Sequence, residues 1–337
     1  MATVYKSFLN DDVISTRTLL HEAIPITGSI ISGTYAEANI KNFSHGKFQS
    51  VYDYPYLSSS ANHIFDVTMG YSTGSGLSGS VDAVNENHKI QMYNQMAQIL
   101  AGHGEDGTLL RFDEDGNLLA GGAKIDEAVF LSFSRLIVKD EIKKGTVQLV
   151  IGTGSYADPF SGTKTVSDYG AATTYFVNSP AGEYGILYTS SVDTSSQVGL
   201  VYYQAGIMVL TASVFSGSDF SSTQTIEEAI TGSSIQSFCD GVRHRVRDID
   251  FNNTIELNSS IYFCRINHNE FNYSSNPTYL SASQIRVKNE SLDSPVTYIT
   301  TVGLYGSDNE LLATAKLSEP LRKSPENEII LRVRLDY

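Results

Sequence analysis

The sequence predicts a mainly β protein with a minor α contribution, built from antiparallel, sandwich-like sheets plus one or two short helices. Three observations support this fold class. Apolar and polar residues alternate with a period of two in several segments, and the alternation is cleanest over residues 329–337. Helical periodicity is restricted to short stretches. Turn-forming residues, including Asp-Gly pairs and Gly/Ser-rich loops, separate the apolar segments.

Changes in periodicity divide the chain into three expected regions. Residues 1–125 mix short strands, a helix and Gly/Ser-rich loops, and we expect an N-terminal α+β region there. Residues 126–225 are expected to form a central β domain, and residues 226–337 a C-terminal antiparallel β domain. The length of 337 residues is by itself sufficient for about two domains with substantial cores.

The N-terminal region contains the clearest helical pattern. Gly102 is placed to end a helix over 89–100. Its apolar residues recur at helical spacing: Ile90, Tyr93, Ala97 and Leu100. A strand through Ile64 and Val67 precedes a Gly/Ser-rich loop over 70–80, and Asp115-Gly116 predicts a hairpin turn within 109–119.

Two hairpins are expected in the central region. Residues 129–133 and 147–151 both alternate, and the polar link over 139–145 could join them. Residues 199–203 and 207–210 form a second pair around Ala205-Gly206. A capping box at Thr225 and Glu228 then predicts a short helix that ends at Gly232.

The C-terminal region is expected to be β-rich to its last residue. Gly306-Ser307-Asp308-Asn309 predicts a turn before a strand over 311–317, and Asn276-Pro277-Thr278 predicts another sharp turn. The final strand places one set of side chains on one face: Ile329, Leu331, Val333, Leu335 and Tyr337. Because chain ends fray unless something holds them, we expect this strand to pair with a sheet, either of this chain or of a partner.

Composition and charge argue against several classes of function. Hydrophobic residues make up 41% of the sequence and charged residues 18%, which is typical of a packed globular protein. The net charge of −14 is unfavourable for binding a nucleic acid backbone or an anionic membrane. No secretory signal or membrane-spanning segment is visible, so we expect synthesis in the cytosol. Cys239 and Cys264 lie in apolar surroundings and are expected to be small buried residues rather than a disulfide.

Three catalytic or binding motifs match without their usual context. Residues 70–74 match the G-x-S-x-G nucleophile elbow, but more Gly/Ser loop follows where a helix is needed. Gly74, Gly76 and Gly79 match a dinucleotide fingerprint, again with no helix immediately after them. Residues 113–117 have the acidic density of a calcium loop, yet Lys124 occupies the position of the bidentate glutamate. The seven histidines show no zinc-binding spacing. We therefore expect no catalytic, cofactor or metal site.

The one basic cluster is Arg243-His244-Arg245-Val246-Arg247. On a strand its three arginines would share a face, where they could bind a phosphate or pair with acidic residues across an interface. Ion pairing is the commoner use of such a cluster. Between Lys164 and Arg243 the chain has no Lys, Arg or His, so this segment is a polar to acidic surface that could contact a glycan.

Several C-terminal stretches resemble a recurrent segment in virion structural proteins of large contractile-tailed bacteriophages. They are Tyr262–Arg265, Glu270–Tyr279, Tyr298–Tyr305, Asn309–Leu317 and Arg332–Tyr337, with a milder likeness over Gly199–Leu210. The N-terminal region shares little of this likeness. The resemblance implies a particle component, often tail- or baseplate-associated, and it implies no catalytic residues.

Together these points predict a non-enzymatic structural protein of a contractile-tailed phage virion, associated with the tail or baseplate through protein–protein contacts. The expected partners are other virion proteins and copies of this chain, without cofactor, membrane or nucleic acid. Its location would be the virion after synthesis in the host cytoplasm. The alternative is a surface-exposed receptor-binding, neck or head-decoration protein, and a hydrolase would need a carboxylate pair in a cleft. The candidate assembly contacts are Arg243, Arg245, Arg247, Arg332, Arg334 and Tyr337.

Overall fold

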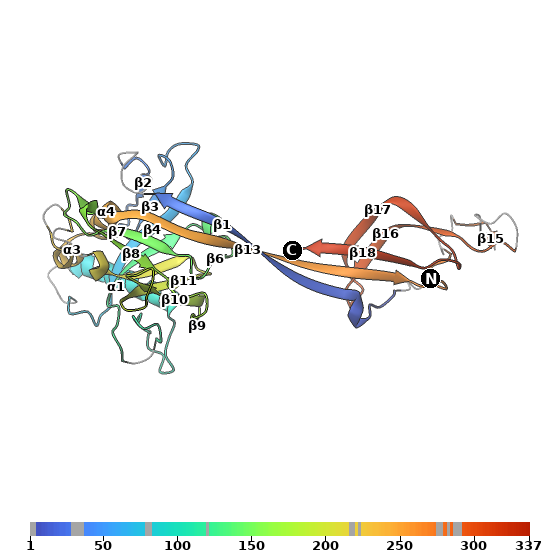
Figure 1. The fold of residues 1–337 in the computed structure, drawn as a ribbon, viewed down its shortest axis with the longest axis horizontal. Helices are drawn as coiled ribbons and strands as arrows, with labels where there is room; N and C mark the ends of the chain where they lie inside the picture. The colour runs from blue at the N-terminus through green and yellow to red at the C-terminus, as the bar shows by residue number, and fades with distance from the viewer. Residues whose placement is uncertain are drawn as a thin grey trace. The chain divides into compact units, whose positions relative to one another are not determined.

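The computed structural model describes residues 5–27, 37–77, 83–118, 121–215, 220–221, 224–273, 279–281, 284–285 and 292–337 (Figure 1). The chain is mainly β, with 44% of residues in strands and 16% in helices, and its strand ladders are antiparallel, as the sequence predicts. It divides into two compact units. Unit 1 consists of residues 1–19 and 256–337, and unit 2 of residues 20–255. Two long strands, β1 (Val13–Thr27) and β13 (Val246–Ile266), contribute residues to both units.

Unit 2 is organised by one large sheet. From β13 onward, the strand order is β13-β7-β8-β10-β11-β12-β5-β4-β3-β2, while β6 pairs with β13 and β9 with β10. The strand bounds are β2 (Ile40–Asn42), β3 (Gln49–Tyr52), β4 (His63–Tyr71), β5 (Glu127–Phe133), β6 (Glu141–Ile142), β7 (Gln148–Gly152), β8 (Thr163–Ser167), β9 (Phe176–Ser179), β10 (Gly182–Tyr188), β11 (Gln197–Tyr202) and β12 (Ile207–Thr211).

Helices accompany this sheet, and both of its faces are buried. The helices are α1 (Ala83–Leu100), α2 (Arg135–Val138), α3 (Ile226–Gly232) and α4 (Ile235–Arg245), with short 3-10 turns at Pro159–Ser161 and Ala212–Phe215. Alternate residues of β5 belong to different clusters: Val129 packs in one with Phe238 of α4, and Phe130 in the other with Tyr93 of α1. Because successive side chains of a strand point to opposite faces, β5 contributes to the hydrophobic clusters on both faces of the sheet.

Close packing of α1 on β4 depends on Gly70. A Cβ at this position would lie 2.5 Å from the carbonyl oxygen of Lys89 and 2.6 Å from the backbone nitrogen of Tyr93. Both atoms belong to the backbone of α1, which cannot move aside as a flexible side chain could. The glycine in the apparent nucleophile elbow thus has a packing role.

Unit 1 contains a three-stranded sheet, β1-β13-β18, and a hairpin of β16 (Thr297–Tyr305) with β17 (Leu311–Lys323). A short 3-10 turn at Asn10–Asp12 precedes β1, and a two-stranded ladder joins β14 (Leu280–Ser281) to β15 (Gln284–Ile285). The final strand, β18 (Ile329–Asp336), pairs antiparallel with the chain's own β13, from Ile266 opposite Ile329 to Ser259 opposite Asp336.

The predicted faces of the final strand are confirmed along most of its length. Leu331 and Val333 are buried, while Arg332 and Arg334 are exposed. Tyr337 departs from the pattern, because 73% of it is exposed. The sequence left open whether the final strand pairs with this chain or with a partner. The structure shows that it pairs with this chain's own sheet.

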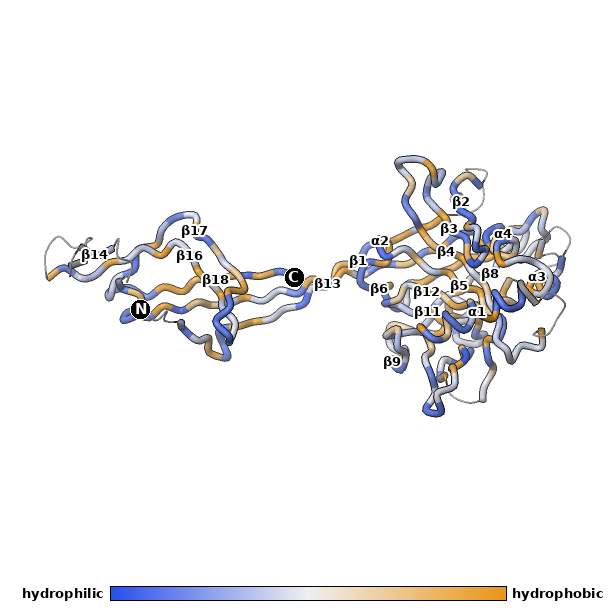
Figure 2. Tube along the Cα trace, turned by 180° about the vertical axis from the view of Figure 1, so that it is seen from behind, coloured by the Kyte–Doolittle hydropathy of each residue, from blue (hydrophilic) through white to orange (hydrophobic). Residues whose placement is uncertain are grey.

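Unit 1 buries very little apolar surface. Among its described residues, three apolar side chains are buried, Leu304, Leu331 and Val333, whereas unit 2 buries 52. Both hydrophobic clusters consist of unit 2 residues. Seven polar residues are buried in unit 1: Asp12, Ser259, Ser260, Asn272, Thr297, Lys323 and Ser324. In Figure 2, hydrophobic stretches run along the strands of unit 1, where their side chains remain largely exposed.

Some predicted pairings are confirmed and others are wrong. The hairpin of β11 with β12 forms as expected. The strand predicted over 311–317 lies within β17, and the predicted turn before it joins β17 to β16. The expected hairpin of 129–133 with 147–151 does not, because β5 pairs with β4 and β12, and β7 with β8 and β13. The Asp115-Gly116 turn forms, and Gly116 has a φ of +74°. The pairing across it joins Asp113 to Lys124, which lies beyond the hairpin expected over 109–119. Leu119, Gly79 and 276–278 lie outside the described residues.

The helices and the domain boundaries also differ from expectation. The helix expected over 89–100 begins at Ala83, the capping-box helix ends at Gly232 as predicted, and α2 and α4 were not predicted. The compact units do not follow boundaries at 125 and 225. A boundary at 125 would separate β4 from β5, which are paired along their lengths, and one at 225 would remove α3 and α4 from the core they complete.

Candidate functional site

The candidate site is a groove of about 750 Å³ in unit 1. One wall of the groove is formed by the N-terminal segment and the end of β13, and the other wall by β16. Aromatic side chains from these segments line it, accompanied by hydroxyl and amide groups. The lining residues include Tyr5, Phe8, Phe271, Tyr273, Tyr298 and Tyr305.

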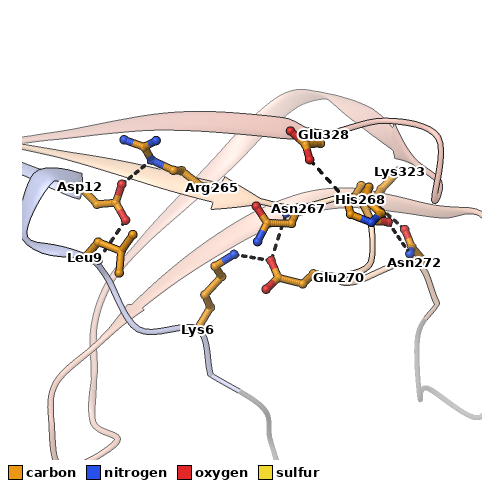
Figure 3. A network of polar contacts seen from close by, with 10 residues as sticks. All are labelled: Lys6, Leu9, Asp12, Arg265, Asn267, His268, Glu270, Asn272, Lys323 and Glu328. Atoms are coloured by element: carbon orange, nitrogen blue, oxygen red, sulfur yellow. Dashed lines mark hydrogen bonds and ion pairs between the residues drawn. The ribbon is translucent and has the colours of Figure 1, made fainter.

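Two ion pairs attach the N-terminal segment to the rest of unit 1 (Figure 3). Lys6 pairs with Glu270, and Asp12 pairs with Arg265 of β13. Asp12 also accepts a hydrogen bond of 3.0 Å from the backbone N–H of Leu9, which closes the turn before β1. The segment therefore forms a fixed wall of the groove, and Tyr5 packs edge-on against Tyr305 with ring centres 4.8 Å apart.

These contacts stabilise the ionised carboxylates. The backbone N–H of Leu9, and after it the Arg265 guanidinium, lower the pKa of Asp12 against the opposing effect of burial. The Lys6 ammonium and the N–H of Asn267 lower the pKa of Glu270. Both acids are consequently held in the charged form that their partners require.

A buried lysine organises the neighbouring turn. Lys323, at the end of β17, is fully buried, and its ammonium donates to Asn272 Oδ1 at 2.6 Å and to the carbonyl oxygens of Ser324 at 2.7 Å and His268 at 3.1 Å. Three acceptors satisfy the three donors of the ammonium. Removal from water lowers its pKa. The interior of unit 1 is thus held by hydrogen bonds more than by apolar packing.

The chemistry available in the groove is limited. Cys264 lines it, and burial raises the pKa of this thiol, which disfavours the nucleophilic thiolate. Within the described ranges, no group of three or more His, Cys, Asp or Glu residues is arranged to hold a metal ion. The aromatic and hydroxyl lining is suited to contact with another macromolecule.

The basic cluster is placed differently from the prediction, which had its arginines on one strand face. Arg243 and Arg245 belong to α4, and Arg247 to β13. Arg243 is 4% exposed and pairs with Asp240 at 2.9 Å, while Arg245 is fully buried and donates to the carbonyl oxygens of Gly152 and Gly154. Arg243 and Arg245 therefore stabilise unit 2 internally, and Arg247 is exposed.

The other three candidate contacts lie on unit 1. Arg332, Arg334 and Tyr337 are exposed on or just after β18. Arg334 donates to Asp336 at 2.7 Å and to Ser259 at 3.1 Å, and the Tyr337 hydroxyl lies 3.1 Å from that of Ser260. They do not line the groove, and they belong to the same sheet as its β13 wall.

The catalytic motif matches have structural explanations. Ser72 is 2% exposed and donates to Asp126 at 2.5 Å, and its hydroxyl accepts from Gly74 N–H, so it stabilises the loop after β4. Asp113 is buried and forms an ion pair with Lys124, the residue that occupies the glutamate position of a calcium loop.

The groove itself was missed by the sequence reasoning. Its walls come from the two ends of the chain, and period-two alternation does not reveal which distant segments meet. The sequence does contain one signal of the groove. Tyr5 and Phe8 are two aromatic residues in a polar N-terminal segment, outside the alternating strands.

Comparison with known proteins adds no relative. No family model, no curated protein and no solved structure matches this chain. In the part of the chain that the structure describes, no helix is long and apolar enough to cross a membrane.

Proposed function

We propose that this chain is a structural component of a contractile-tailed phage virion, associated with the tail or baseplate, and that it acts through protein–protein contacts made by unit 1. The resemblance of the C-terminal stretches suggests the kind of particle. The geometry of unit 1 supports an assembly role in preference to catalysis.

The observation that carries this proposal is the exposure of apolar side chains in unit 1. Seventeen large apolar side chains are exposed among its described residues, against the three that are buried. Burying an aliphatic or aromatic side chain contributes about 1.5–3 kcal/mol, so three such residues contribute about 5–9 kcal/mol. This is far below the conformational entropy cost of ordering a unit of about 100 residues, which is on the order of 100 kcal/mol. Large exposed apolar surfaces are typical of binding sites.

The strand edges of unit 1 provide a second reason. Within the described pairings, β1 and β18 lie on opposite sides of β13 and form the two edges of its three-stranded sheet. The seven residues of β1 that belong to unit 1, residues 13–19, are exposed on both faces. Edge strands present unpaired backbone groups that readily accept a further strand.

Cryo-EM of the intact particles made by the encoding phage tests this proposal. We expect density for unit 1 in contact with other subunits of a tail or baseplate ring. Density on the head surface, at the neck or on free fibre tips would instead support the receptor-binding or decoration alternative. Absence of the chain from purified virions, measured by mass spectrometry, would refute both.

A further inference from the structure

We propose that the groove of unit 1 is covered by unit 1 of a second copy of this chain, so that the protein forms a homo-oligomer. This inference names a partner for the assembly role proposed above and rests on that role.

The groove occupies the place where a β-sandwich would have its core. Packed sheets fill the roughly 10 Å between them with interdigitating side chains, whereas here about 750 Å³ between β13 and β16 is open. Twenty-four residues line this space. One side of a standard protein–protein interface contributes about 20–30 residues. The groove can therefore form part of such a binding surface.

The distribution of charge indicates which part of a second copy could meet the groove. Unit 1 carries ten Lys and Arg residues against twelve Asp and Glu, a net charge of −2, while unit 2 carries thirteen against twenty-five, a net charge of −12. Two copies that meet through unit 2 would bring strongly acidic surfaces together. Contact through unit 1 avoids this repulsion, and both signs of charge are available there for pairing across the interface.

The second copy also offers a matching surface. Exposed apolar residues lie on unit 1 outside the groove: Leu311 and Leu312 of β17 are 50% and 70% exposed, and Ile330 of β18 is 61% exposed. These side chains on one copy could enter the groove of the next. Since the inserting and receiving surfaces differ, the contact is heterologous, and its repetition builds a ring if the rotation closes and a filament if it does not.

The first experiment measures the mass of the purified full-length chain by light scattering across a range of concentrations. We expect an oligomer. Tyr298→Glu, which places a charge on a groove residue that is 58% exposed, is expected to produce monomer. Tyr54→Glu is the matched control, because Tyr54 is 48% exposed on unit 2, and it should leave the oligomer intact.

The second experiment uses the thiol already present in the groove. Cys239 is fully buried, so an aromatic disulfide reagent at mildly alkaline pH reports mainly on Cys264. We expect slow reaction in the oligomer and reaction several-fold faster after Tyr298→Glu, with no such signal in a Cys264→Ser variant. This readout shows whether the groove itself is covered.

The outcomes separate this inference from the proposed function. A wild-type chain that is monomeric at all concentrations overturns the inference, even if the chain is found in virions, and leaves the groove to a different protein. An oligomer with a freely reactive Cys264 overturns it too, because the copies then meet elsewhere. An oligomer with a protected Cys264 supports it, even if the chain proves absent from tails.

Discussion

At the scale of single residues, Asp168 shows how a buried carboxylate holds a turn of unit 2. Its two oxygens accept from Gly145 N–H at 2.7 Å, Val147 N–H at 2.9 Å and the Tyr203 hydroxyl at 3.1 Å. Burial raises the pKa of Asp168 to about 6 even though these hydrogen bonds oppose the shift. The ionised carboxylate is therefore stabilised by these three donors, while burial opposes its charge.

Asp168→Asn is expected to lower the free energy of unfolding by about 1–3 kcal/mol, because the amide NH₂ would face a buried donor. It should also remove a pH dependence. Since the folded pKa is raised, the wild-type carboxyl contributes most stability below about pH 4, and this contribution is lost as the pH rises towards 6. Urea unfolding across this range should show the wild-type advantage shrinking with pH, and an advantage that grows would contradict the assignment.

Gly70→Ala tests the close approach of α1 to β4. A methyl group 2.5 Å from the Lys89 carbonyl oxygen would force the helix outward, and we expect a loss of about 1–3 kcal/mol. Gly76→Ala is the control, because nothing lies within 4 Å of a Cβ there. Thermal unfolding followed by circular dichroism should separate the two variants, and equal melting temperatures would argue against this packing.

At the scale of elements, β18 is the strand on which the sheet of unit 1 depends. Leu331→Ser with Val333→Ser removes two of the three buried apolar side chains of this unit, and we expect β13 residues 259–266 to lose hydrogen-exchange protection while β5 keeps it. Ile330→Ser with Arg332→Ser changes the exposed face of the same strand and serves as the control. Equal protection in both double variants would show that β18 does not depend on its buried face.

The elements also show what the sequence could and could not predict. Alternation identified β5, β7, β11, β12, β17 and β18, because a period of two records which face each residue occupies. It could not identify the neighbour of β5, since many alternating strands offer a similar face. The strand considered for Arg243 and Arg245 was wrong, because both residues belong to α4, which also contains Gly241. In α4 that glycine makes room for Phe220, whose ring would lie 2.6 Å from a Cβ.

The groove was beyond prediction for a related reason. Its lining combines the N-terminal segment with β16, nearly three hundred positions later in the chain, and the ion pairs that fix Lys6 and Asp12 are formed with residues of the C-terminal part. Surface charges give no periodic signal of such pairing. The predicted exposure of Arg332 and Arg334 followed from alternation alone, and it is confirmed.

At the scale of the whole molecule, acid should affect the two units differently. Ion pairs and hydrogen bonds lower the pKa values of Asp12, Glu270 and Asp336 in unit 1. In unit 2 burial raises the pKa of Asp168, and the lowered pKa values of Asp106 and Asp193 come from hydrogen bonds within their own exposed loops. Stability from a lowered pKa is present above the ordinary value near 4 and is lost as the pH falls through the folded value. We therefore expect unit 1 to unfold first on acidification.

Limited digestion with pepsin between pH 4.5 and 2.5 measures this order. Cleavage within residues 256–337 should begin at a higher pH than cleavage within the sheet of unit 2. A variant with Asp12→Asn and Glu270→Gln should be cleaved in unit 1 already at pH 4.5, because it lacks the same contacts at any pH. Simultaneous loss of both units would indicate a single cooperative structure.

The polar interior of unit 1 has a consequence for calorimetry. The heat-capacity change on unfolding grows with the apolar surface that becomes exposed and is reduced by polar surface. A unit that buries seven polar residues and three apolar ones should therefore melt with a small heat-capacity change. If a second copy covers the groove, most of the heat-capacity change associated with unit 1 should appear when the copies associate, and little of it when the single chain folds.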